Sequence, residues 1–343
     1  MPEGIPTVTL PARLFSPSQA FQDPVTTATC TLVAVALAAS FVIIHGLRRG
    51  GRLDDALYAE LRRRWTTWCV IVPVLLVPIL LGALPTVLAW CTLSLFCHGE
   101  YARATGLFRY KSLVMVNLAG IVAVNFAVLD HYYRLFVALT PLVVALLVAI
   151  AILSDHPKGY LQRVCLAVLG FSLFGCWLGH FTYFTNDAKY RPILLWILLG
   201  VECNDIFAYL SGRMFGRRKL CPNTSPNKTV EGALGALVLT TALVAAVGHF
   251  VFRGEAMDTP WLLCLLGALF SVAGQFGDLL FSSIKRDLGI KDLGVVLPGH
   301  GGLLDRFDSL ILVSPIVFHF VNYVQGVGLG ERSNLITGSF GNP

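Results

Sequence analysis

Apolar residues occur along this chain in long blocks, which short polar segments separate. Most blocks are roughly as long as a helix needs to be to cross the hydrocarbon core of a bilayer. The pattern predicts ten membrane-spanning helices, at approximately 28–47, 67–82, 84–98, 112–129, 132–153, 162–184, 192–211, 232–252, 260–282 and 308–325. The second and third spans are short and meet near Pro85, which predicts a tight hairpin between them. We therefore expect an all-α fold, a polytopic transmembrane helical bundle.

Composition supports a membrane protein. Of the 343 residues, 55% are hydrophobic and only 13% are charged, with a mean hydropathy of +0.70. Soluble domains rarely exceed an apolar share of about 50%. Residues 1–27 lack the features of a cleavable signal peptide. The nine cysteines form no CxxC pair, which favours small packing residues over a zinc site or a disulfide framework.

The distribution of Lys and Arg predicts the orientation. If the ten spans alternate, 20 of the 26 basic residues fall on one side, in the segments 48–66, 99–111, 154–163, 212–231 and 283–307. Cytoplasmic loops carry this excess of positive charge. We expect a multi-pass protein of the cell (inner) membrane with both termini outside. Segment 48–66, with six arginines and scattered apolar residues, is predicted to lie along the membrane surface.

Charged residues concentrate between the last two spans. Residues 277–309 contain five acids and four bases, namely Asp278, Asp287, Asp292, Asp305, Asp308, Lys285, Arg286, Lys291 and Arg306. A charged side chain at the centre of a membrane helix costs about 3 kcal/mol, so ionisable residues at a membrane are functional candidates. This segment is therefore the first place to look for chemistry.

Asp278, Ser282 and Lys285 follow a helical spacing in this segment. At positions i, i+4 and i+7 they share one face of a helix, which brings a carboxylate, a hydroxyl and an ammonium into line. An interhelical ion pair with a lysine that reaches the membrane surface would use the same residues. Both interpretations place the group near the cytoplasmic end.

The end of the segment, Pro298-Gly299-His300-Gly301-Gly302, is rich in glycine. Glycines let a backbone approach a ligand closely and offer N–H groups to phosphate oxygens, although the same string could form an ordinary turn. Asp305 and Asp308 follow at i and i+3 and could present two carboxylates to one cation. Magnesium favours such oxygen ligands. Capping of the next helix by either aspartate is the alternative.

A second polar cluster occurs at the end of the seventh span and in the loop after it. The cluster combines small flexible residues with bases, which suits a polyphosphate, and includes Asn204, Asp205, Tyr209, Gly212, Arg213, Ser225 and Lys228. A basic loop also follows from orientation alone, or from binding of anionic lipid headgroups. The chain has no GxxxxGK[ST] sequence, so a P-loop is not supported.

Together the two clusters bring carboxylates and cations to helix ends that a bundle can gather. Carboxylates with several cations are typical of metal-assisted phosphoryl or nucleotidyl transfer. No arrangement for covalent acyl chemistry is evident.

These residues resemble a known signature. The run Ser282-Ser283-Ile284-Lys285-Arg286, then Lys291-Asp292, then Pro298 to Asp308 is similar to the complete signature of the phosphatidate cytidylyltransferases, or CDP-diacylglycerol synthases. The earlier stretch, Asn204-Asp205 with Ala208-Tyr209, Gly212-Arg213 and Ser225 to Gly232, also resembles that family. The likeness covers roughly 66–325.

The resemblance implies a reaction of phospholipid biosynthesis, in which CTP and phosphatidate give CDP-diacylglycerol and pyrophosphate. It implies Mg²⁺ as cofactor, with K⁺ as a further candidate, and suggests a homodimer; no nucleic acid is implied. By position, Asp278, Asp305 and Asp308 would bind metal, and Asp278, Lys285 and Asp305 would be catalytic. The residues implied at the substrates are Ser282, Arg286, Lys291, His300, Arg306, Asn204, Asp205, Tyr209, Arg213, Ser225 and Lys228.

Four regions follow from this reading. They are an N-terminal extension with one added span and a basic loop (1–65), an N-terminal membrane bundle (66–190), a catalytic membrane region (191–325) and a C-terminal tail (326–343). Alternatives are a related membrane enzyme that uses another lipid phosphate or a polyprenol, and a transporter or lipid-binding protein without catalysis. Charges near the middle of several spans would favour a transporter, whereas here they cluster toward cytoplasmic ends.

Overall fold

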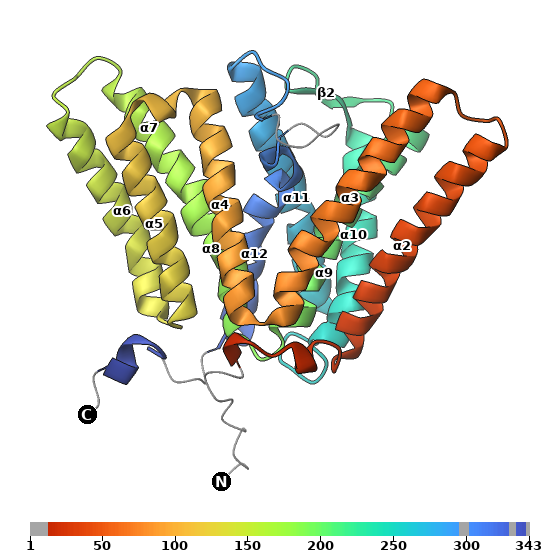
Figure 1. Cartoon of the computed structure of the whole chain (residues 1–343), viewed down its shortest axis with the longest axis horizontal. Coiled ribbons are helices and arrows are strands. Elements are labelled where there is room, and N and C mark those ends of the chain that lie inside the picture. The colour runs from red at the N-terminus through yellow and green to blue at the C-terminus, as the bar shows by residue number, and fades with distance from the viewer. Residues whose placement is uncertain (1–12, 295–301, 329–333, 341–343) are drawn as a thin grey trace, which may run out of the picture.

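A computed structural model describes residues 13–294, 302–328 and 334–340. The described residues form a bundle of long helices that run back and forth between two ends (Figure 1). One end carries the connection between α2 and α3, the connection between α6 and α7, and the small β hairpin. Described residues near both termini lie at the opposite end. The all-α fold is confirmed.

The predicted spans all correspond to helices. They are α2 (Pro24–Arg49), α3 (Asp55–Leu81), α4 (Ala83–Thr105), α5 (Lys111–Leu129), α6 (Tyr133–Leu153), α7 (Tyr160–Phe171) continuing through a π-helical turn (Ser172–Trp177) into α8 (Leu178–Tyr183), α9 (Tyr190–Phe215), α10 (Val230–Val251), α11 (Pro260–Asp287) and α12 (Asp308–Val324). Eight of these elements are long and apolar enough to cross a membrane. The helix α12 is apolar but shorter, and α4 buries polar side chains such as Ser94, His98 and Glu100.

The segment 48–66 does not lie along a membrane surface as a separate element, and that prediction is wrong. The Asp54 carboxylate accepts a hydrogen bond from the backbone N–H of Leu57 at 2.6 Å, so it caps α3 at its first turn. The arginines at 62–64 therefore belong to the same helix as the following span. The connection between α2 and α3 is only residues 50–54, shorter than the predicted loop 48–66.

The hairpin between α3 and α4 is confirmed. Gly82 alone separates the two helices and adopts a φ of +149°, a conformation that L side chains rarely reach. A Cβ atom there would lie 2.5 Å from the carbonyl oxygen of Leu14, so the N-terminal segment packs directly against the turn.

A two-stranded antiparallel hairpin occupies part of the predicted loop 212–231. Its strands are β1 (Lys219–Cys221) and β2 (Ser225–Thr229), and Lys219 pairs with Thr229. The Thr229 hydroxyl accepts a hydrogen bond from the backbone N–H of Gly232 at 3.1 Å and so caps α10. The hairpin and its cap fix the position of Lys228, one residue earlier.

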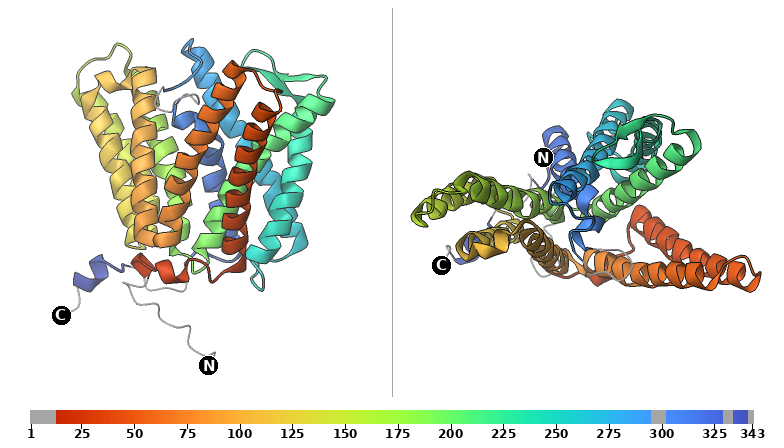
Figure 2. Two further views of the ribbon diagram at one scale, coloured as in Figure 1. Left: turned by 45° about the vertical axis from the view of Figure 1, so that its right-hand side comes forward. Right: turned by 90° about the horizontal axis from the view of Figure 1, so that it is seen from above.

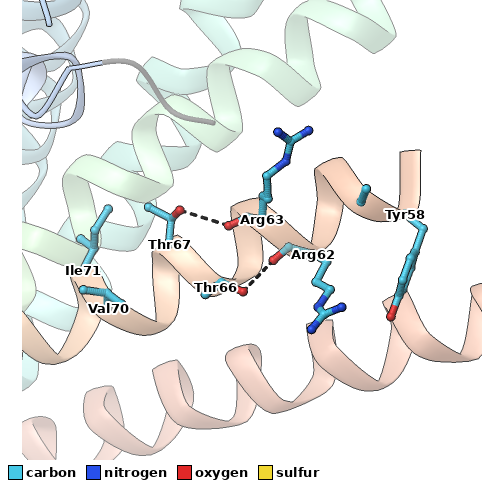
Figure 3. A pocket seen from close by; sticks show the side chains of 8 residues that line it. Tyr58, Arg62, Arg63, Thr66, Thr67, Val70 and Ile71 are labelled. Carbon is cyan, nitrogen blue, oxygen red and sulfur yellow. Dashed lines mark hydrogen bonds between the residues drawn. The ribbon is translucent and has the colours of Figure 1, made fainter. Parts of the chain in front are cut away.

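The helices α2 and α3 form an arm on one side of the bundle (Figure 2). Few of their residues are buried within the chain: only 6% of the most apolar 18-residue stretch of α2 and 11% of that of α3. An open groove of about 530 Å³ runs along α3 (Figure 3). Arg62 and Arg63 lie toward one end, and Val70 and Ile71 toward the other. The arm thus presents apolar surface with arginines near one end.

Candidate active site

The helix α11 contributes the first group of polar side chains. Asp278 and Ser282 share one face, as their spacing predicts, and the Ser282 hydroxyl donates to the Asp278 carboxylate at 3.3 Å. Lys228 of β2 reaches the same carboxylate, with 2.5 Å between Nζ and Oδ2. The two clusters that the sequence singled out therefore meet at Asp278.

Lys285 connects α11 to the segment that precedes α12. Its ammonium donates to Asp305 at 2.7 Å, and the two side chains are only 12% and 4% exposed. The other oxygen of Asp305 accepts from the backbone N–H groups of Leu293 and Gly302, at 3.2 and 3.1 Å. The Asp305 carboxylate thus binds the Lys285 ammonium and also the backbone at residues 293 and 302, on either side of the segment between them.

Asp205 is the contribution of α9. Its side chain is solvent-accessible and interacts electrostatically with Asp278, Lys228 and Arg306. Asp205 lies ten residues before the end of α9 at Phe215, or about 15 Å along the helix. The site is therefore set below the end of the bundle and not on its rim.

Asp308 begins α12 and is buried beside the other acids. It interacts electrostatically with Asp278, Asp205 and Lys285, and one of its oxygens accepts from the N–H of Ser309 at 2.7 Å. Neither Asp305 nor Asp308 occupies the N-cap position of α12, which belongs to Phe307.

Gly277 explains how α11 comes so close to this segment. A Cβ atom at Gly277 would lie 2.6 Å from the carbonyl oxygen of Asp308 and 2.8 Å from the Cα of Ser309. Only glycine permits this approach of the two backbones. The adjacent Asp278 is thereby held next to Asp308.

Sequence reasoning missed Glu100. This buried residue of α4 accepts hydrogen bonds from the backbone N–H groups of Leu303 and Leu304, at 3.1 and 2.8 Å. A Cβ atom at Gly302 would lie 2.9 Å from its carboxylate. The only sign of Glu100 in the sequence was an acidic residue at the end of an apolar span. Its partner is about 200 positions away, so spacing could not identify it.

Several predicted residues lie apart from this group. Asn204 is fully buried, and its side-chain oxygen accepts from Thr240 and Ser271, so it joins α9, α10 and α11. Tyr209 is 62% exposed and accepts a hydrogen bond from Arg213. The remaining predicted residues are Arg286 and Lys291, which are exposed, Ser225, which is half-buried in β2, and His300, which lies outside the described residues.

A known protein family matches the sequence over most of the chain. The sequence profile of the cytidylyltransferase family matches residues 62–324. The chain belongs to the cytidylyltransferase family. It is therefore a nucleotidyltransferase, and the extension before residue 62 lies outside the family match.

Individual relatives are similar to this chain over different shares of its length. The chain is 34% identical over 245 residues to the uncharacterized protein YnbB of Escherichia coli K12, covering 68% of this chain and 80% of the relative. It is 39% identical over 140 residues to a phosphatidate cytidylyltransferase of Staphylococcus haemolyticus, covering 41% and 53%. A phosphatidate cytidylyltransferase of Staphylococcus epidermidis is 34% identical over 206 residues, covering 59% and 68%.

The carboxylates of the candidate active site fit a hard divalent cation in part. Asp205, Asp278 and Asp308 interact with one another and supply oxygen donors, the type that magnesium prefers. Among the described residues, no group of three or more His, Cys, Asp or Glu side chains is placed so that it could hold a metal ion by itself. Magnesium usually retains waters and shares substrate phosphates, so a partial set is compatible with it.

Proposed function

We propose that this chain transfers a cytidylyl group from CTP to phosphatidate, which yields CDP-diacylglycerol and pyrophosphate. A phosphate oxygen of the lipid forms a bond to the α-phosphorus of CTP. The bond between that phosphorus and the oxygen bridging to the β-phosphate breaks, and its electron pair leaves with pyrophosphate. The lipid phosphate is already a nucleophile, so no strong general base is needed.

The observation that supports this reaction best is the meeting of cations and carboxylates from four parts of the chain. Lys228, Lys285 and Arg306 lie among Asp205, Asp278, Asp305 and Asp308. Transfer between phosphates depends mainly on positioning and on neutralising negative charge, which such a group supplies. The printed names of the staphylococcal relatives favour phosphatidate as the acceptor.

Each cation has a distinct place in this proposal. Lys228 comes from a hairpin at one end of the bundle and suits the phosphates of CTP. Lys285 is held by Asp305 near Asp308, where it can face the attacking lipid phosphate. A divalent cation held by Asp278 and Asp308, with Asp205 close by, would neutralise the charge that builds on the leaving pyrophosphate, while Asp305 holds Lys285.

The proposed orientation places this site on the cytoplasmic side of the inner membrane, where CTP is available. The phosphatidate would reach it from the bilayer. The end of the bundle that carries the site also carries the connection between α2 and α3, with Arg48 and Arg49 at the end of α2 and Arg52 in the connection. Cytoplasmic loops carry such an excess of basic residues.

The test uses purified protein in detergent with magnesium and labelled CTP. We expect labelled lipid with phosphatidate and little product with polyprenyl phosphate, and we expect ATP and GTP to be poor donors. An authentic phosphatidate cytidylyltransferase assayed in parallel serves as the positive control. The proposal is wrong if only that control forms product, or if another lipid phosphate is the better acceptor.

A further inference from the structure

A cavity of about 220 Å³ lies between the α2–α3 arm and the catalytic part of the bundle. Its walls come from α2, α3, α9 and the start of α12. Most lining side chains are apolar, among them Val33, Val72, Leu75, Leu198 and Leu310. A site for CTP would need polar groups along its length, so this cavity suits hydrocarbon.

One end of the cavity is charged. Glu202 of α9 and Arg306 line it there and interact electrostatically. Glu202 stands three residues before Asp205 on the same helix face, and Arg306 directly follows Asp305. The apolar space therefore leads to the carboxylates and cations of the proposed active site.

Part of the cavity wall comes from residues that lie outside the match to the family. The match to the cytidylyltransferase family begins at residue 62, whereas Thr29 and Val33 of α2 line the cavity. These two residues are four positions apart and so face the same side of the helix. Thr29 is buried and Val33 is half-buried although α2 as a whole is largely exposed. The extension thus closes the cavity on one side.

We propose that this cavity binds a segment of one acyl chain of the lipid substrate, and that α2 forms its outer wall. The inference rests on the proposed function. The occupant follows from the gradient along the cavity, which is lined by apolar side chains over most of its length and by Arg306, paired with Glu202, where it meets the proposed active site. A phospholipid has the same gradient, with its phosphate above its chains. The cavity is smaller than the usual 300 Å³ or more of sites for whole ligands, so it holds only part of one chain.

The proposal assigns α2 a role in acyl-chain selection. Filling the cavity should exclude a long chain and leave the phosphate site intact. Val33→Trp fills it from α2, a helix with few internal contacts that can tolerate the change. Val35→Trp is the matched control, because Val35 is 58% exposed and does not line the cavity.

The first experiment compares dipalmitoyl and dihexanoyl phosphatidate as substrates in detergent. We expect Val33→Trp to lower kcat/KM for the dipalmitoyl lipid about tenfold or more and to change that for the dihexanoyl lipid little. One or two methylenes in an apolar pocket already produce such factors. The control variant should match the wild type with both lipids. Equal losses with both lipids, or no loss with either, would overturn the proposal.

The second experiment measures binding without catalysis. A phosphatidate with a photoreactive group within its acyl chain is irradiated with the protein, and the labelled peptides are identified. Labels on residues 24–49 and on α9 that Val33→Trp removes and Val35→Trp retains are expected. Labelling elsewhere only would contradict the acyl-chain site. If the wild type makes no CDP-lipid from either phosphatidate, the proposed function fails, and the labelling result still decides whether the cavity binds a lipid.

Discussion

The Glu100 carboxylate accepts a hydrogen bond from the backbone N–H of Leu304 at 2.8 Å. The contact joins α4 to the turn that leads into α12, directly before Asp305. A second bond, from Leu303, shares the same side chain. Glu100 therefore anchors the backbone from which Asp305 extends toward Lys285.

Replacing Glu100 should impair catalysis through this anchor. Glu100→Ala leaves the buried N–H of Leu304 without its acceptor, at a cost of about 1–3 kcal/mol, and also frees the partly buried N–H of Leu303. We expect kcat to fall at least about tenfold, because small displacements of catalytic groups can cost up to about a hundredfold. Glu100→Gln keeps one acceptor oxygen and should recover part of the loss. The measurement is kcat and KM with CTP and phosphatidate.

Glu60→Gln is the matched control for this series. Glu60 pairs with Arg64 on the exposed part of α3, so its replacement should leave both constants unchanged. If Glu100→Ala has wild-type kcat, the anchor is not needed. If KM for CTP rises while kcat stays constant, Glu100 supports binding and not the position of Asp305.

Lys285 is expected to act in the transfer itself. Lys285→Met keeps the length of the side chain and removes its charge, and we expect kcat to fall about 10²–10³-fold, the typical loss for one oriented donor. Lys219→Met removes an exposed charge of β1 and should have little effect. Comparable activity of the two variants would show that Lys285 is only a structural partner of Asp305.

Gly277 offers a steric test of the site. Gly277→Ala would place a Cβ atom 2.6 Å from the carbonyl oxygen of Asp308, so α11 and α12 must separate. We expect most activity to be lost, although no polar group is removed. Gly99→Ala in α4 is the control, since a Cβ atom there meets nothing within 4 Å. Full activity of Gly277→Ala would mean that the close approach of the helices is unnecessary.

The orientation can be tested by labelling from outside the cell. In a background without the native cysteines, a cysteine at Gly254 should react with a membrane-impermeant maleimide in intact cells. A cysteine at Asp155 should react only after the membrane is permeabilised, because 154–159 lies at the basic end of the bundle. The reverse pattern would place the proposed active site outside the cytoplasm and exclude free access to CTP.

Hydropathy predicted the spans well because each transmembrane helix must carry a long apolar block whatever it packs against. The helical period likewise placed Asp278 and Ser282 on one face. The start of α3 was missed because a cap at Asp54 extends the helix into polar sequence that hydropathy assigns to a loop. Hydropathy and helical periodicity relate residues that are only a few positions apart along the chain.

Contacts between distant segments could not be predicted in the same way. The pair of Lys228 and Asp278 depends on a β hairpin in a sequence with weak strand signals. The bond from Glu100 to Leu304 depends on which helices become neighbours, and no spacing rule contains that information. The contribution of α2 to the cavity wall could not be predicted either, because it depends on how α2 packs against α3 and α9.

The most direct test of the central claim is the fate of the CTP phosphates. Wild-type protein receives phosphatidate with CTP labelled either at the α- or at the γ-phosphate, beside Asp278→Asn as the inactive reference. The account predicts that α-label enters the lipid, that γ-label appears in pyrophosphate, and that the variant transfers little of either. Transfer of γ-label to lipid would identify a kinase and contradict the account.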